Sequence, residues 1–297
     1  MEKNMGLSRD AEKVIGIVAV AVGFIACLAV GAALMMGINS ERASEKSDVK
    51  YEFFDAIKAN DLQKVKEMLK ETPELVNIPL SETEKEYSKN LNDDTPLIAA
   101  GVNMPMIRLL VENGADVNAQ TPISGRYPVT AVLARAEIDR FDVAWFYIGK
   151  GAALDCEDKI NGNLPYAAIS QYVYGHSSGV QEDAREMLEF LTKKGVRMYM
   201  PASMKSDMSS LLGVAAKNNH CCAIIHLLSL SNEFNINEKV TYDGKTALMV
   251  AAKNGCYQAV YELQRRGAHE GLKDDAGHTA YDYARMSGND YVIGLLE

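Results

Sequence analysis

The sequence predicts an all-α solenoid, a stack of helix-turn-helix units with short hairpin loops. The first indication is a repeat, because Thr246 and Thr279 open two copies of one pattern that lie 33 residues apart. The second is that each copy holds two short apolar stretches of helical spacing, divided by a glycine. A fixed period of about 20–50 residues is typical of stacked units, each of which buries its apolar face against its neighbours.

The copy at residues 243–268 shows how one unit is built. Gly244 permits a tight turn, because glycine accepts positive φ at little cost. Thr246 is expected to begin the first helix, where its hydroxyl accepts a backbone N–H that the helix leaves unpaired. Gly255 then ends the first helix, and Gly267 ends the second. The residues expected to face the core are Leu248, Ala251, Ala252, Val260 and Leu263.

Similar units recur in register along residues 51–297, with about seven copies. One begins at Thr95 and closes with the string Gly114-Ala115-Asp116-Val117-Asn118. These features resemble the ankyrin repeat, whose fold is a turn, two antiparallel helices and a projecting loop. The resemblance implies a binding protein that uses the concave face of its first helices and its loop tips. The family often has a histidine three residues after the threonine, and these positions here hold Ile98, Met249 and Asp282.

An apolar segment ahead of the array predicts one transmembrane helix. Residues 14–36 contain no charged side chain. As a helix they would be about 34 Å long, enough for the roughly 30 Å hydrocarbon core of a bilayer. The predicted order is therefore an N-terminal tail at 1–13, a transmembrane helix at 14–36, a polar linker at 37–50 and an ankyrin-repeat array at 51–297.

Two processed forms of the N-terminus remain as alternatives. A cleaved signal peptide has an apolar core of about 7–15 residues, shorter than this segment. A lipoprotein signal ending at Cys27 would leave nine apolar residues behind it. The alternative reading is therefore an exported or lipid-anchored ankyrin effector with a processed N-terminus.

The transmembrane segment also carries a stripe of small residues, Ala19, Gly23, Cys27 and Gly31. Such a stripe lets two membrane helices approach closely, so we expect helix–helix self-association. The side of the membrane is less determined, because three basic residues lie near each end of the segment and the positive-inside rule nearly ties. The short tail favours a cytoplasmic N-terminus and an extracytoplasmic array.

Charge limits the partners of the array. The formal net charge is −9, and residues 1–50 hold six basic and six acidic side chains, so the whole excess belongs to residues 51–297. An acidic surface without a basic stripe is a poor partner for nucleic acid, so we expect none. A protein partner fits better, although its identity cannot be read from the residues.

The cysteines predict no disulfide framework, because their spacing is irregular. Free thiols are more usual in the cytoplasm, which weighs against an extracytoplasmic array. The side of the array therefore stays open. The five cysteines are Cys27, Cys156, Cys221, Cys222 and Cys256.

No sequence motif indicates a catalytic site. Gly244-Lys245-Thr246 resembles the end of a phosphate-binding loop, but the glycine required five residues earlier is Lys239. His220 and His226 flank two adjacent cysteines, a spacing that does not suit tetrahedral zinc. The sequence therefore predicts no catalytic residue, no cofactor, no metal site and no enzyme activity.

The predicted function is a membrane-tethered protein–protein interaction module, a scaffold or adaptor. A regulator or inhibitor of an enzyme is an alternative that uses the same surface. A stretched fourth copy is expected to form a loop around residues 172–179 with two tyrosines, and the single tryptophan is either an interface anchor or a packing residue. The predicted protein-binding residues are Trp145, Tyr127, Tyr172, Tyr174 and Tyr242.

Overall fold

The computed structural model describes residues 48–81, 94–134, 141–175, 177–201, 210–218 and 220–297. The chain divides after Asp55 into two compact units, and each is described by itself. In the first unit, residues 48–55 are helical, including the last three residues of the predicted linker. The predicted transmembrane helix at 14–36 and its small-residue stripe lie outside the described residues. Among the residues that are described, no helix is long and apolar enough to cross a bilayer.

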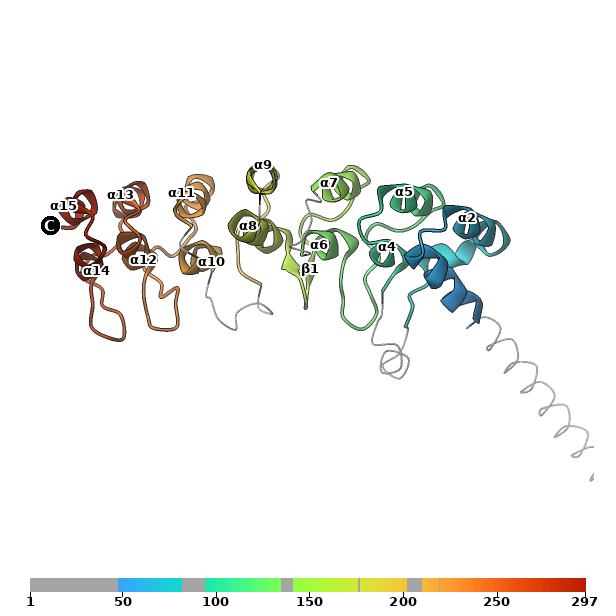
Figure 1. The fold of residues 1–297 in the computed structure, drawn as a ribbon, viewed down its shortest axis with the longest axis horizontal. Coiled ribbons are helices and arrows are strands. Elements are labelled where there is room, and N and C mark those ends of the chain that lie inside the picture. The colour runs from blue at the N-terminus through green and yellow to red at the C-terminus, as the bar shows by residue number, and fades with distance from the viewer. Residues whose placement is uncertain (1–47, 82–93, 135–140, 176, 202–209, 219) are drawn as a thin grey trace, which may run out of the picture. The chain divides into compact units, whose positions relative to one another are not determined.

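In the second unit, helices form two rows, and Figure 1 shows the first helix of each pair below the second. This is the predicted all-α array. The first helices are α4 (Pro96–Ala99), α6 (Pro128–Leu133), α8 (Leu164–Tyr174), α10 (Leu211–Lys217), α12 (Ala247–Lys253) and α14 (Ala280–Ser287). The second helices are α2 (Leu62–Glu71), α5 (Met104–Glu112), α7 (Phe141–Gly149), α9 (Ser178–Lys193), α11 (Cys221–Leu230), α13 (Tyr257–Arg265) and α15 (Asp290–Leu296).

The remaining elements are short. A 3₁₀ helix, η1, covers Pro73–Asn77, and one antiparallel hairpin joins β1 (Glu157–Asp158) to β2 (Gly162–Asn163). Each first helix from α4 to α14 contacts the next first helix along the chain, and the second helices from α7 to α15 do the same. The core therefore runs between the two rows and is built from neighbours, as a repeat array requires.

Small residues allow the first helices to pack closely. Ala251 and Ala252 of α12 are fully buried, and Ala215 and Ala216 hold the same place in α10. Burial of these alanine pairs confirms the predicted core face of the first helices.

Threonine caps begin three of the first helices, α4, α12 and α14, as the sequence predicts. The hydroxyl of Thr246 accepts from the backbone N–H of Met249 at 3.4 Å, and Thr95 caps α4 in the same way. At Thr279 the cap is reciprocal, because the Asp282 carboxylate accepts the Thr279 backbone N–H at 2.8 Å. Asp282, which stands where the family often has histidine, therefore still fixes the start of its helix.

Asparagine side chains join one loop to the next. Asn118 Nδ2 donates to the carbonyl of Gly151 at 3.0 Å, and its Oδ1 accepts from the backbone N–H of Ala153 at 2.8 Å. Asn77 bridges to Gly114 and Asp116 with the same two bonds, and Asn237 bridges to Gly267 and His269. We call this two-bond contact the asparagine bridge.

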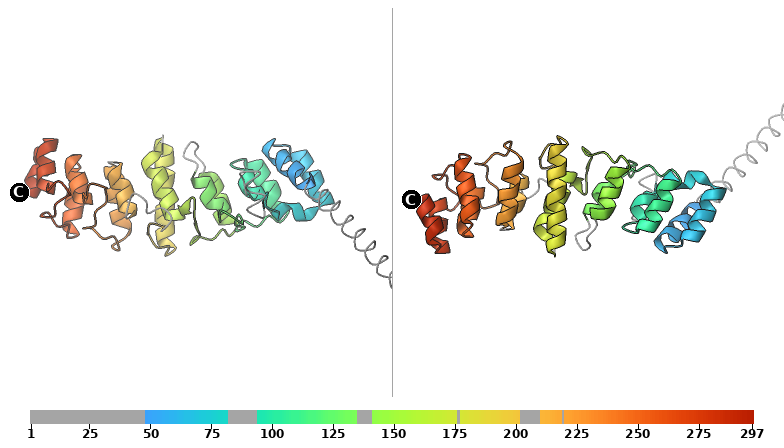
Figure 2. Two further views of the ribbon diagram at one scale, coloured as in Figure 1. Left: turned by 90° about the horizontal axis from the view of Figure 1, so that it is seen from below. Right: turned by 90° about the horizontal axis from the view of Figure 1, so that it is seen from above.

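The stretched fourth copy is helical, which corrects the predicted loop. Tyr172 and Tyr174 lie in the last turn of α8, which has 11 residues, and Ser177 caps the 16-residue α9. The added residues therefore lengthen both helices, and Figure 2 shows α9 extending beyond its neighbours. The chain reverses at Gly175, where a Cβ would lie 2.5 Å from the Gln171 carbonyl oxygen, so a larger residue does not fit.

A disulfide joins Cys221 to Cys256, with the two Cα atoms 5.8 Å apart. Cys221 is the first residue of α11 and Cys256 precedes α13, so the bond ties together the starts of two neighbouring second helices. The expectation of no disulfide is therefore wrong. Cys156 is a buried free thiol and Cys222 an exposed one.

The asparagine bridge predicts the effect of one isosteric change. Asn118→Asp keeps the acceptor but removes the donor to Gly151, so the free energy of unfolding should fall by about 1–2 kcal/mol. Urea unfolding of the full chain measures this value. Gln258→Ala removes an exposed amide of α13 and should leave it within about 0.5 kcal/mol. Equal stability of Asn118→Asp and the wild type would contradict the role of the bridge.

Candidate protein-interaction surface

An uncharged groove of about 300 Å³ lies along the first helix α8. The end of α6 and the turn between β1 and β2 close its sides. We call it the α8 groove. The elements that form it, first helices and a hairpin turn, are those that the sequence nominates for binding. Its lining residues are Ala134, Ile160, Asn161, Tyr166, Ala167, Ser170, Gln171 and Tyr174.

A buried carboxylate shapes the hairpin turn beside the groove. Asp158 is 3% exposed, and its Oδ1 accepts the backbone N–H groups of Ile160, at 2.9 Å, and of Asn161. Its Oδ2 accepts from the hydroxyl of Thr130 in α6. These bonds satisfy the buried charge and hold the turn against the first helix. As a consequence the Ile160 side chain is directed outward and remains 53% exposed.

Polar contacts fix the floor and the rim of the groove. Gln171 is buried, and its Nε2 donates to the Leu133 carbonyl at 2.6 Å, which ties α8 to the end of α6. At the rim, the Tyr174 hydroxyl accepts from Nδ2 of Asn218 at 2.9 Å, while the ring stays 47% exposed. Ser170 Oγ is buried and has no hydrogen-bond partner in the described structure. The groove therefore offers two largely exposed side chains to a partner, Ile160 and Tyr174.

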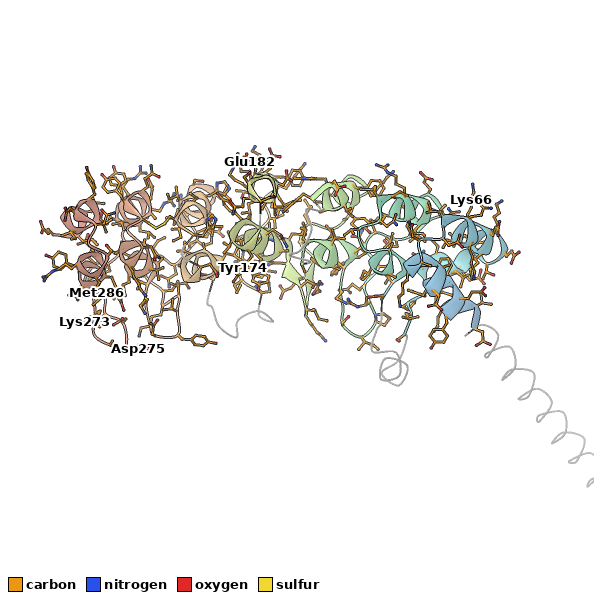
Figure 3. All side chains as sticks on the ribbon, in the orientation of Figure 1. Lys66, Tyr174, Glu182, Lys273, Asp275 and Met286 are labelled. Atoms are coloured by element: carbon orange, nitrogen blue, oxygen red, sulfur yellow. A yellow bond between two sulfur atoms is a disulfide. The ribbon has the colours of Figure 1, made fainter. Side chains whose placement is uncertain are left out.

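The predicted binding tyrosines occupy different environments. Tyr174 lines the α8 groove, among the first helices in Figure 3. Tyr242 lies far along the chain in the turn before α12 and is 70% exposed. Tyr127 precedes α6 and is half-buried, and burial and nearby negative charges raise its pKa.

Tyr172 does not have the exposure that a docking residue needs. Its side chain is 8% exposed and its ring packs against His220 and His226, with centroids 5.2 and 5.8 Å away. Burial raises the pKa of its hydroxyl. The helical conformation of residues 172–174 causes this difference, because it turns Tyr172 toward the next repeat and Tyr174 outward. The structure therefore groups Tyr174 alone of the predicted residues with the α8 groove.

The Trp145 side chain packs between two second helices, α7 and α9. It lies in the second helix α7, is half-buried, and meets the ring of Phe190 from α9 edge to face, with centroids 5.0 Å apart. Such pairs contribute about 0.5–1.5 kcal/mol beyond their buried area. Of the two roles left open by the sequence, the structure favours packing, with Phe190 as the ring that contacts Trp145.

Ile160 and Ser170 belong to the groove but were not among the predicted residues. Ile160 stands in a polar turn, Asp158 to Gly162, where an exposed aliphatic side chain is unusual. That contrast is a usable sequence signal. The unpaired hydroxyl of Ser170 depends on the packing of α6 against α8, so no local pattern reveals it.

Comparisons with known families place ankyrin repeats in two stretches of this chain. Residues 92–122 match a family model described as "Ankyrin repeat", and residues 212–297 match one described as "Ankyrin repeats (3 copies)". The ankyrin repeat domain of Bcl-3, described as a unique member of the IkappaB protein family, superposes with a TM-score of 0.51 at 21% identity over 82% of this chain and 96% of that one. The fold is thus the all-helical ankyrin-repeat fold.

The curated relatives that match this chain are far longer than it is. The "Probable E3 ubiquitin-protein ligase XBOS34" of Oryza sativa subsp. japonica is 32% identical over 43% of this chain and 23% of its own length. The "Ankyrin repeat and KH domain-containing protein mask-1" of Caenorhabditis elegans is 24% identical over 75% of this chain and 9% of its own length. The chain thus spans less than a quarter of either relative.

The packing of Trp145 gives a stability prediction. Trp145→Ala removes the ring from between α7 and α9, so the free energy of unfolding should fall by about 2 kcal/mol, less than for a fully buried tryptophan. Tyr242→Ala, at a 70% exposed position, is the control and should change it by at most about 0.5 kcal/mol. Urea unfolding measures both. If the two variants matched in stability, the packing role of Trp145 would be excluded.

Proposed function

We propose that this ankyrin-repeat chain is a membrane-tethered protein–protein interaction module, and that the α8 groove receives part of its partner. The observation that carries the proposal is the uncharged lining of this groove within an array whose formal charge is −9. Ile160 and Tyr174 stand exposed at its edges. Exposed aromatic and aliphatic anchors beside a groove are the usual centres of binding energy in protein interfaces.

The chemistry of the groove favours binding over catalysis. Among the residues that the structure describes, its lining holds no carboxylate, imidazole, thiol or amine, and Ser170 has no base beside it. A serine nucleophile requires an adjacent proton acceptor. The groove is therefore assigned to recognition.

The tether is assigned to residues 14–36, on the sequence argument of length and apolarity. The array is assigned to the extracytoplasmic side. The bond between Cys221 and Cys256 supports that side, because disulfides form and persist in oxidising compartments.

The binding role of the groove is tested with two substitutions and a matched control. Crosslinking in intact membranes identifies the partner, and purified components then give the affinity. Tyr174→Ala and Ile160→Glu should each weaken binding at least tenfold, or about 1.4 kcal/mol, with little change in unfolding. The control is Tyr261→Ala, because Tyr261 is also 47% exposed but lies on α13, in the other row. If Tyr261→Ala lost as much affinity as Tyr174→Ala, the α8 groove would be rejected as the binding site.

The tether and its side are tested in membranes prepared with a thiol-blocking reagent. The full chain should remain in the pellet after a carbonate wash, whereas a variant lacking residues 14–36 should be released. Without reductant, mass spectrometry should recover a peptide pair linked through Cys221 and Cys256. Recovery of both cysteines as blocked thiols would contradict an extracytoplasmic array. An N-terminus that begins at Cys27, or after residue 36, would instead support the processed effector.

A further inference from the structure

The junction between the loops Gly151–Asp155 and Gly195–Tyr199 lacks the asparagine bridge. In the bridged loop that begins at Gly114, the bridging residue Asn118 lies four positions after the glycine. In the next loop, Gly151–Asp155, that position holds Asp155. In the described structure no hydrogen bond joins Asp155 to the following loop, Gly195–Tyr199.

The following loop nevertheless has the backbone shape of the bridged ones. Gly195 has φ of 77°, compared with 92° at Gly151, which is bridged. The N–H after each glycine donates to the carbonyl five residues earlier, from Ala152 at 2.9 Å and from Val196 at 3.0 Å. The loop therefore presents the Gly195 carbonyl and the Arg197 N–H as the bridged loops present theirs. Within the described residues, neither group has a hydrogen-bond partner.

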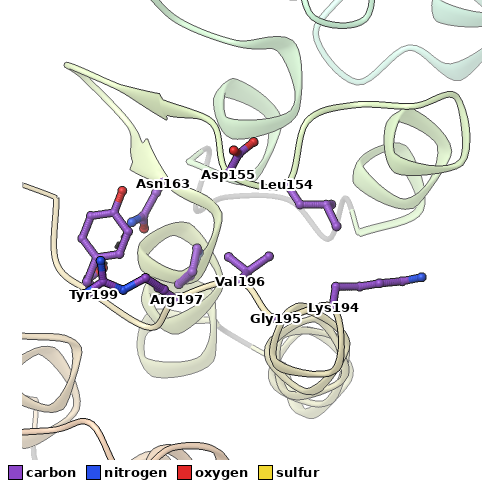
Figure 4. Close-up of a pocket in the computed structure, with 9 residues that line it drawn as sticks. Leu154, Asp155, Asn163, Lys194, Gly195, Val196, Arg197 and Tyr199 are labelled. Carbon is purple, nitrogen blue, oxygen red and sulfur yellow. Dashed lines mark hydrogen bonds between the residues drawn. The ribbon is translucent and has the colours of Figure 1, made fainter.

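Charge explains why Asp155 makes no bridge. A carboxylate has no N–H to donate, so it would bring two acceptors together at the Gly195 carbonyl. Figure 4 shows the exposed Asp155 carboxylate directed away from Gly195 and Arg197.

A groove of about 580 Å³ lies at this junction, and we call it the Asp155 groove. It shares no lining residue with the α8 groove. Two cations stand beside it, Lys194 over the ring of Phe190 at 5.6 Å and Arg197 over the ring of Tyr199 at 5.9 Å. Neither is in an ion pair within the described chain. The residues that line the Asp155 groove are Leu154, Asp155, Asn163, Pro165, Lys194, Gly195, Val196, Arg197 and Tyr199.

We propose that the Asp155 groove binds an extended acidic segment of a partner protein and seats a carboxamide side chain, of asparagine or glutamine, in the place of the missing bridge. The amide nitrogen of this side chain donates to the Gly195 carbonyl and to the Asp155 carboxylate, after the exposed Asp155 side chain rotates toward the groove. Its oxygen accepts from the Arg197 backbone N–H. The array shows that this chemistry suits the loop, because Asn118 makes the first and third of these bonds to the preceding one.

Charge decides the sequence around that carboxamide. Lys194 and Arg197 favour acidic neighbours on either side of it, because they are unpaired cations in an acidic array. Asp155 meanwhile disfavours a carboxylate in the carboxamide position itself, since like charges would meet there. The groove thus distinguishes asparagine from aspartate at one position and prefers acid next to it.

The decisive variant is Asp155→Asn, which supplies the missing bridge from the chain itself. The probes are the peptides acetyl-Leu-Asn-Glu-amide and acetyl-Leu-Leu-Glu-amide, titrated calorimetrically into the full chain in detergent. The wild type should bind the asparagine peptide at least tenfold more tightly than the leucine peptide. Asp155→Asn should lose at least tenfold in that affinity, melt a few degrees higher, and exchange its Arg197 amide hydrogen more slowly.

Asp290→Asn removes the same charge from the exposed start of α15 and should leave affinity and amide exchange at 195–199 unchanged. Equal binding of the two peptides by the wild type would overturn the proposal, as would full retention of binding by Asp155→Asn. These results are independent of the α8 groove, because Tyr174→Ala should bind both peptides as the wild type does. The proposal for either groove can therefore fail without affecting the proposal for the other.

Discussion

Contacts between neighbouring loops set the spacing on which the rest of the array depends. A helix pair in such an array has no core of its own, so its stability comes from the surface that it shares with the next pair. The asparagine bridge controls that shared surface at the loop end, because one amide satisfies both a carbonyl and an N–H of the next loop. Asn118 therefore does for two loops what caps do for a helix end. It pairs backbone groups that would otherwise have to remain hydrated.

The features that distinguish this chain arise where that regularity is interrupted. The added residues of the fourth copy lengthen α8 and α9, and the α8 groove and the Asp155 groove both lie against this pair of helices. The longer α8 ends at the exposed Tyr174, which therefore lies in the row of first helices. It also separates the Gly151 and Gly195 loops in sequence. One local change thus accounts for both candidate binding places.

The fold was largely predictable from the sequence because it rests on local signals that recur. Thr246 and Thr279 mark helix starts, and Gly255 and Gly267 mark helix ends, so about seven weak copies of one pattern reinforce one another. The disulfide was not predictable, because Cys221 and Cys256 are 35 residues apart and meet only through the stacking of α11 and α13. The prediction that Tyr172 lies in a loop was wrong for a related reason. An insertion between two helices can extend the helices or form a loop, and Gln171 to Tyr174 contains no residue that would end a helix.

The bond between Cys221 and Cys256 also has a mechanical consequence. If a partner pulls on the far end of a chain anchored at its other end, repeats with only neighbour contacts can peel away one after another. Force that reaches Cys256 passes directly to Cys221 through the covalent bond. The 35-residue span between them is then shielded from tension. Peeling from that end would therefore release α13 to α15, whereas α11 and α12, which lie between the two cysteines, would bear no tension.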